Sequence, residues 1–180
     1  MNMLLKVLVI MGILLVILIG VAYLLPSRWS VERSIVINAP STAIHPEVEN
    51  LKKWEEWTPW ATKGDPSVVQ TYEGPEAGKG AIMRWHGEKM GTGMMMITES
   101  DPTKGITFEM QLDSAGNMGD GSIRYQPEGN GTRVTWSSNG KLGNSPVSRY
   151  FGLMIDSLVG ANYDKGLANL KQKVEHPPHG

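Results

Sequence analysis

Residues 7–25 form an uncharged run, VLVIMGILLVILIGVAYLL, dominated by leucine, isoleucine and valine. An α-helix rises about 1.5 Å per residue, so about 20 apolar residues span a hydrocarbon core about 30 Å thick. A helix also satisfies its backbone hydrogen bonds without water, as lipid requires. The run therefore predicts a transmembrane anchor over residues 1–26 and leaves residues 27–180 to build the rest of the fold.

The residues on either side of this run indicate whether it is cleaved and how it is oriented in the membrane. A cleaved signal peptide has an apolar region of about 7–15 residues and a small-x-small cleavage site. The exit, VAYLLPS at 21–27, offers no good site, so we expect an uncleaved signal anchor, with cleavage as the alternative. Lys6 before the span favours a cytoplasmic N-terminus and an extracytoplasmic domain at the cell membrane, although Arg28 and Arg33 after it nearly balance the charge count.

Composition narrows the chemistry of the remaining residues. The chain has no cysteine, which excludes disulfides, thiolate metal sites and a cysteine nucleophile. Its formal net charge is −1 at pH 7 and no basic patch stands out, so nucleic acid is not an expected partner. Residues 27–175 are long enough for one domain with a sizeable core, and 176–180 are expected to be a disordered tail.

Period-two alternation between turn residues predicts a mostly antiparallel β domain. Residues 41–54 lie between the first two strands and are predicted to form short helical pieces. Ser41 is the expected N-cap, and Pro46 is expected either to interrupt these pieces or to open a helix. Gly129-Asn130-Gly131 is a hairpin signal, and a turn is expected over 113–119. The expected strands are residues 30–37, 68–72, 81–86, 92–99, 105–112, 121–126 and 132–138.

A long C-terminal helix is predicted over residues 146–174. Its apolar residues follow three- and four-residue steps, and Gly160 and Gly166 mark close packing or a kink. An α+β fold, with a curved seven-stranded antiparallel sheet around this helix, satisfies the order of elements. The apolar residues read as one helix face are Val147, Phe151, Met154, Leu158, Leu167, Leu170 and Val174.

Seven short motifs in this order carry a family resemblance. They are INAP at 37–40, WEEWTPW at 54–60, YEG at 72–74 with Gly80, RWHG at 84–87, ITES at 97–100, GTRVTW at 131–136 and KGLANLK at 165–171. Over residues 30–175 the chain resembles the SRPBCC superfamily, which has the helix-grip fold of START domains and the birch pollen allergen. It is most similar to the membrane-anchored, polyketide cyclase/dehydrase-like branch. His45 departs from the aromatic or bulky apolar residue that is usual there.

The resemblance implies a cavity between the concave sheet face and the long helix. Strand alternation then places apolar side chains inward, where they either line a ligand pocket or fill a core. The tryptophans that recur every three residues at 54–60 either frame the mouth of the pocket or pack their loop onto the sheet. The candidate ligand-binding residues are Trp54, Trp57, Trp60, Met83, Trp85, Met95, Ile97, Phe108, Met110, Tyr125, Trp136, Phe151, Met154 and Leu158.

No constellation in the sequence predicts a catalytic residue, a metal site or a cofactor. The four histidines lack metal-ligand spacing, and none of the common hydrolase, P-loop or dinucleotide-binding motifs occurs. Three functions stay open. The first is a membrane-anchored binding domain for a hydrophobic small molecule or lipid. The others are an enzyme that resembles polyketide cyclases or dehydratases, and a protein-interaction module in the style of chaperone activators, whose protein partner the sequence does not name.

Overall fold

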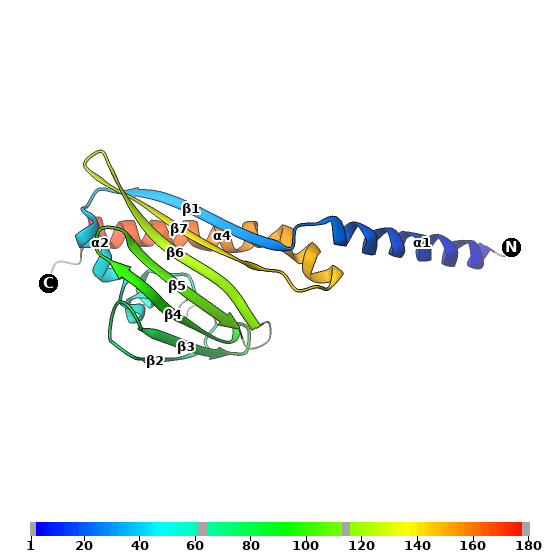
Figure 1. Ribbon diagram of the computed structural model, residues 1–180, viewed down its shortest axis with the longest axis horizontal. Coiled ribbons are helices and arrows are strands. Elements are labelled where there is room, and N and C mark those ends of the chain that lie inside the picture. The colour runs from blue at the N-terminus through cyan, green and yellow to red at the C-terminus, as the bar shows by residue number, and fades with distance from the viewer. Residues whose placement is uncertain (1–2, 61–64, 113–115, 178–180) are drawn as a thin grey trace.

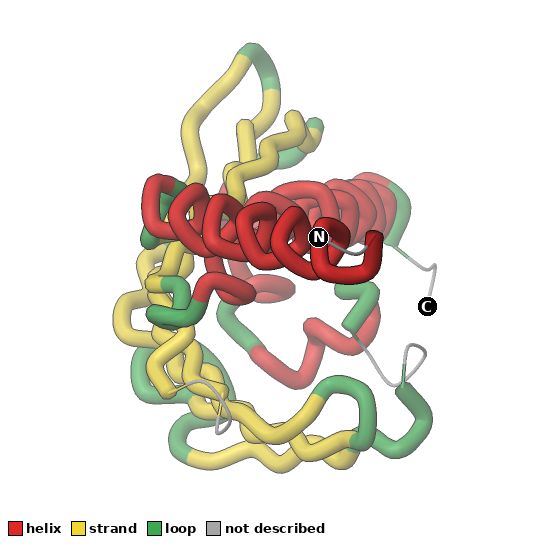
Figure 2. Tube along the Cα trace, turned by 90° about the vertical axis from the view of Figure 1, so that its right-hand side faces the viewer, coloured by secondary structure: helices red, strands yellow, loops and turns green. Residues whose placement is uncertain are grey.

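The computed structural model describes residues 3–60, 65–112 and 116–177 (Figure 1). An apolar helix leads into an α+β domain that ends in a long helix. The sheet curves around its helical side, as an end view shows (Figure 2). The elements are α1 (Met3–Leu24), β1 (Arg28–Ile37), α2 (Ser41–Val48), the 3-10 helix η1 (Leu51–Lys53), α3 (Trp54–Trp57), β2 (Val69–Glu73), β3 (Ile82–Gly87), β4 (Gly91–Asp101), β5 (Gly105–Leu112), β6 (Gly116–Glu128), β7 (Gly131–Lys141) and α4 (Pro146–Glu175).

The seven strands form one antiparallel sheet in the order β1-β7-β6-β5-β4-β3-β2. This order and the long C-terminal helix confirm the predicted helix-grip fold. The hairpin between β6 and β7 is also confirmed, because Glu128 pairs with Gly131 and Gly129 has a φ of 58°. Part of the turn expected over 113–119 and part of the tail expected over 176–180 lie outside the described residues.

The short helical segment differs from the prediction at two positions. The N-cap of α2 is Pro40, without a side-chain cap, and Ser41 is already helical. Pro46 lies inside α2 instead of interrupting it. The helix ends two residues later, at Val48, so the proline removes one hydrogen bond, the one to the carbonyl of Thr42, from a helix already near its end.

An aromatic cluster fills the space between the sheet and the second half of α4. The ring of Trp136 stacks on Tyr163 with centroids 4.1 Å apart. The rings of Trp54, Trp57 and Trp60 meet Trp136 at 5.5, 5.4 and 5.5 Å with steeply inclined planes. Burial raises the pKa of Tyr163 to about 12, and its hydroxyl donates to Ser138 Oγ over 2.6 Å. We call these five aromatic residues, together with Phe108, the aromatic cluster.

Both helix glycines that the sequence singles out mark close packing. A Cβ at Gly160 would collide with the guanidinium of Arg33, which crosses α4 there to bind Asp156 at 3.0 Å and Asp164 at 3.2 Å. A Cβ at Gly166 would lie 3.0 Å from the Trp136 ring. These two contacts hold α4 against β1 and the aromatic cluster.

Asp65 ties the segment before β2 to the turn between β3 and β4. Its side chain accepts hydrogen bonds from Ser67 Oγ at 2.6 Å and from the amides of Ser67, Lys89 and Met90 at 2.9–3.2 Å. These bonds, that of the Ser67 hydroxyl first, lower the pKa of Asp65 to about 2. A lowered pKa stabilises the fold above the unfolded value of about 3.9, and the contribution disappears as the pH falls toward 2.

We therefore expect Asp65→Asn to lower the urea midpoint at pH 6. Between pH 4 and pH 2 the wild-type carboxylate becomes protonated and its contribution to stability disappears. The difference between the two proteins should therefore shrink steadily over this range. Equilibrium unfolding followed by circular dichroism at each pH measures this. Glu88→Gln, at an exposed position in the same turn, is the control and should follow the wild-type curve. A pH-independent difference for Asp65→Asn would contradict the assignment.

Candidate functional site

The inner face of the sheet carries the side chains that alternation places there. Seven of the candidate residues are buried: Trp54, Trp57, Met95, Ile97, Phe108, Tyr125 and Trp136. Four others are half-buried and pack against that core: Trp60, Met83, Trp85 and Met110. The predicted inward face is therefore present, while ligand binding by these residues stays a prediction.

The tryptophan motif packs inward. The indole N–H of Trp54 donates to the carbonyl of Val48 at 2.8 Å, and that of Trp57 donates to the carbonyl of Glu47 at 3.1 Å. Both rings join the aromatic cluster, so α3 is fixed to α2 and to the sheet. Of the two interpretations of this motif, packing onto the sheet has direct support. Trp54 and Trp57 form no exposed patch.

The prediction that the first half of α4 turns its apolar residues toward the sheet was wrong. Phe151, Met154 and Leu158 are 50–55% exposed and lie outside the packed core. Leu158 and Leu167 are nine residues apart, which is about two and a half turns, so a regular helix places them on opposite sides. The core contacts of α4 instead come from Ile155, Val159, Tyr163, Leu167, Leu170 and Val174.

A row of thioethers crosses the inner face at the half of the sheet nearer α1. Met83, Met95 and Met110 are register partners on β3, β4 and β5. Trp85 follows on β3 opposite Gly93, where a Cβ would collide with the indole ring. β3 and β5 both run toward the end of the domain from which α1 extends (Figure 1). We call Met83, Trp85, Met95 and Met110 the inner strip.

Trp85 also carries an unsatisfied polar atom. Its Nε1 is buried and has no hydrogen-bond partner among the described residues. A buried donor without a partner costs about 1–3 kcal/mol, so an acceptor placed beside it by a ligand would recover that free energy. The inner strip thus combines a half-buried apolar surface with one free donor.

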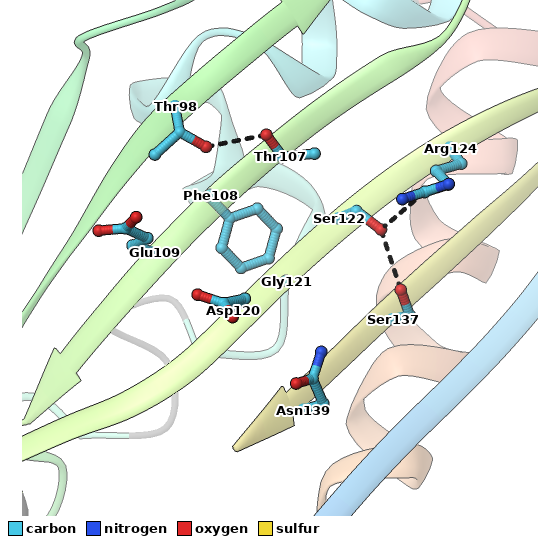
Figure 3. Close-up of a pocket in the computed structure, with 10 residues that line it drawn as sticks. All are labelled: Thr98, Thr107, Phe108, Glu109, Asp120, Gly121, Ser122, Arg124, Ser137 and Asn139. Atoms are coloured by element: carbon cyan, nitrogen blue, oxygen red, sulfur yellow. Dashed lines mark hydrogen bonds between the residues drawn. The ribbon is translucent and has the colours of Figure 1, made fainter. Parts of the chain in front are cut away.

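Two pockets formed by described residues lie elsewhere. The larger, about 360 Å³, is on the outer face of the sheet (Figure 3). Its walls are polar: Thr98 bonds Thr107 at 2.8 Å, and Ser122 bonds Ser137 at 2.9 Å. The smaller, about 230 Å³, lies between η1 and the β2 edge of the sheet. Neither pocket is the cavity that was expected between the sheet and the long helix. Beneath the second half of α4, the aromatic cluster fills that space.

A buried polar network joins α2 to the sheet, and sequence reasoning missed it. His45 Nδ1 lies 3.3 Å from the Tyr125 hydroxyl, and its Nε2 lies 3.0 Å from Ser100 Oγ. Ser100 donates to Glu49 Oε2 at 3.2 Å. A β-bulge between Ile97 and Glu99 shifts the alternation and brings Ser100 to this face. The spacing of His45 and Glu49, one helical turn apart, was the available signal.

The bonding pattern of this network argues for a structural role. Burial and the nearby Glu49 carboxylate raise the pKa of Tyr125, so its hydroxyl keeps its proton beside His45 Nδ1. Ser100 directs its one proton to Glu49, so its oxygen is left to accept a hydrogen bond from His45 Nε2. In this arrangement the Ser100 proton points to Glu49 and not to His45, so the two residues are not set up as a nucleophile and its base. Among the described residues, His, Asp and Glu form no group of three placed to hold a metal ion.

The curved sheet, the long helix and the apolar inner face define a helix-grip domain. Residues 28–175 match the family described as polyketide cyclase / dehydrase and lipid transport, and the chain belongs to this family. No curated protein matches the sequence.

Solved structures show the same fold at low sequence identity. A solution structure from Thermobifida fusca has a TM-score of 0.61 at 17% identity, covering 83% of this chain and 95% of that one. The Aha1 dimer from Colwellia psychrerythraea gives 0.57 at 14% identity, with coverages of 83% and 98%. The crystal structure of Ara h 8.0201 gives 0.56 at 11% identity, with coverages of 82% and 98%. At these identities the likeness extends to the fold alone.

Proposed function

We propose that this protein is a membrane-anchored domain that binds a hydrophobic small molecule or a lipid along the inner strip. The observation that carries the proposal is the half-buried surface of Met83, Trp85 and Met110, which includes a buried indole N–H without a partner among the described residues. Lipid transport in the description of the family supports the same class of ligand.

The chemistry of the inner strip suits an apolar ligand. Burying apolar surface contributes about 25 cal/mol per Å², and thioethers adapt their shape to irregular partners. One acceptor on the ligand, such as a carbonyl or carboxylate oxygen, would satisfy Trp85 Nε1 and fix the orientation. The described residues of the strip carry no acid or base, so the strip favours binding over the cyclase or dehydratase alternative.

The anchoring part of the proposal rests on α1. This helix has 22 residues, and nearly all of its apolar side chains are exposed, unlike those of a buried core helix. A signal sequence would share this composition. However, the Tyr150 hydroxyl donates to the carbonyl of Leu18 at 2.8 Å, and Arg149 Nη1 donates to that of Leu25 at 3.0 Å. Contacts between α1 and the folded domain support retention of the helix. Lys6 before the span supports a domain outside the cytoplasm.

Photocrosslinking tests the binding site. We expect a diazirine fatty acid, added to the full chain in phosphatidylcholine nanodiscs, to label β3 and β5 as well as α1, and excess oleic acid to remove the β3 and β5 adducts. Met83→Gln should reduce those adducts several-fold, because a polar amide replaces a thioether on the apolar face. Peptide mass spectrometry locates each adduct.

Met94→Gln is the matched control. Met94 lies on β4 next to Met95 but belongs to the opposite face, where its sulfur contacts Arg84. Its adduct yield should equal that of the wild-type protein. Labelling confined to the helices, or equal losses in the two variants, would refute binding along the inner strip.

One observation favours the interaction-module alternative. The aromatic cluster leaves a filled core where a ligand cavity was expected. An interaction module would also be expected to expose the tryptophans of α3 to its partner, but Trp54 and Trp57 are buried. Failure of the crosslinking experiment would therefore make a protein partner the next hypothesis.

A further inference from the structure

The first half of α4 carries an apolar surface that no described residue covers. Outside α1, the exposed large apolar residues of the described chain are Val69 and five residues of this half-helix. Four of the five follow steps of four, three and four residues, which places them along one side of the helix. We call these four the α4 stripe: Val147, Phe151, Met154 and Leu158.

This half of α4 lies beside α1. The beginning of α4 overlaps the end of α1 along the long axis of the molecule (Figure 1). Tyr150 reaches the carbonyl of Leu18. Leu18 lies seven residues before Leu25, which corresponds to about 10 Å along a helix. If α1 spans a bilayer, the first turns of α4 therefore lie at the same depth as the C-terminal end of the α1 segment that is in the membrane.

The charges near this junction suit a lipid surface. Arg28 and Lys141 are register partners at the ends of β1 and β7, and Arg149 contacts the end of α1. No acidic residue occurs between Leu142 and Ile155. Basic groups beside an apolar surface bind anionic headgroups, at about 1 kcal/mol for each Lys or Arg near the membrane.

We propose that the α4 stripe is a second membrane contact, seated in the interfacial region of the bilayer that α1 spans. The proposal rests on the anchoring part of the proposed function. Its occupant is lipid, because the stripe continues the apolar surface of α1 and is flanked by basic groups. Two contacts fix the domain relative to the bilayer, with the ends of β3 and β5 on the membrane side.

Spin-label accessibility in the full chain tests this inference, and the absence of cysteine makes single-cysteine variants free of background labelling. Val147→Cys and Met154→Cys probe the stripe, and Leu14→Cys is the reference within α1. Lys165→Cys is the matched control. It is exposed on the same side of α4 as Val147, five full turns further along. The labelled proteins are placed in phosphatidylcholine–phosphatidylglycerol vesicles.

We expect collisions with oxygen to exceed those with a water-soluble nickel chelate several-fold at positions 147, 154 and 14, and the reverse at 165. If the labels at 147 and 154 are exposed to water like the one at 165 while the label at 14 is in lipid, the membrane contact of the α4 stripe is refuted and the α1 anchor stands. A water-exposed label at position 14 would overturn both. Spin–spin broadening at 154 that disappears on dilution with unlabelled protein would assign the stripe to a second copy and overturn the lipid contact.

Discussion

Trp136→Ala is expected to lower the free energy of unfolding by about 3–5 kcal/mol, the usual cost of removing a fully buried large aromatic side chain. Trp136 is 1% exposed and lies at the centre of the aromatic cluster. It stacks on Tyr163 of α4 and meets the rings of Trp54 and Trp57. Alanine would leave an indole-sized void that joins the sheet, α3 and α4, so no single element can close it.

Trp136→Phe separates the void from the ring contacts. Phenylalanine keeps one aromatic ring and removes the indole Nε1, which is buried without a partner among the described residues. Relief of that unpaired donor offsets part of the lost packing, so this variant should lose well under half as much stability. Guanidinium unfolding of the full chain in detergent, followed by circular dichroism, measures both variants.

Val69→Ala, at an exposed apolar position on β2, is the control and should change stability by less than about 0.5 kcal/mol. A loss below about 1 kcal/mol for Trp136→Ala would contradict a filled core, because it is far below the cost of a void. It would also restore the ligand cavity between the sheet and α4 as a working hypothesis. The result therefore bears on function as well as on stability.

Local patterns in the sequence were sufficient to predict the strands and to predict which residues of each strand face the interior. The run from Ile106 to Met110 alternates apolar and polar residues. It pairs with β6 in a single register, which places Ile106, Phe108 and Met110 on one face. The hairpin at Gly129 follows from the two-residue turn that its sequence favours. The order of these elements, together with the motif resemblance, was enough to predict the helix-grip fold.

Contacts between distant segments were beyond the reach of these patterns. Periodicity alone does not show which side of α4 meets the sheet, because Phe151 and Leu158 are as apolar as Leu167 and Leu170. The Arg33 contact with Asp156 and Asp164 helps to fix that rotation, and it joins residues more than 120 positions apart.

In the candidate site, too, local sequence patterns did not predict the contacts between distant segments. The β-bulge that brings Ser100 to His45 leaves no clear mark in the sequence of β4. Likewise, the aromatic cluster fills its space because rings from α3, β7 and α4 meet, and no local pattern encodes that meeting. Alternation could therefore identify inward residues, but it could not distinguish a pocket from a filled core.

Gly105→Ala should destabilise the fold about as severely as the loss of Trp136, although it adds a single methyl group. Gly105 begins β5 with a φ of 103°, a conformation that side chains rarely adopt. A Cβ there would collide with the carbonyl oxygen of Ile123, a backbone atom of the neighbouring strand β6. Backbone strain and overpacking each cost about 1–3 kcal/mol, so we expect a loss of about 3–5 kcal/mol.

Gly129→Ala is the matched control, because it separates the two costs. Gly129 also has a positive φ, 58°, but a Cβ there would meet no atom within 4 Å. It should therefore lose only the left-handed penalty of about 1–2 kcal/mol. Urea unfolding of both variants measures the difference. Equal losses would show that β5 and β6 can separate at little cost. The larger loss at Gly105 would show that this start of β5 is held rigidly, and with it the sheet that carries the inner strip.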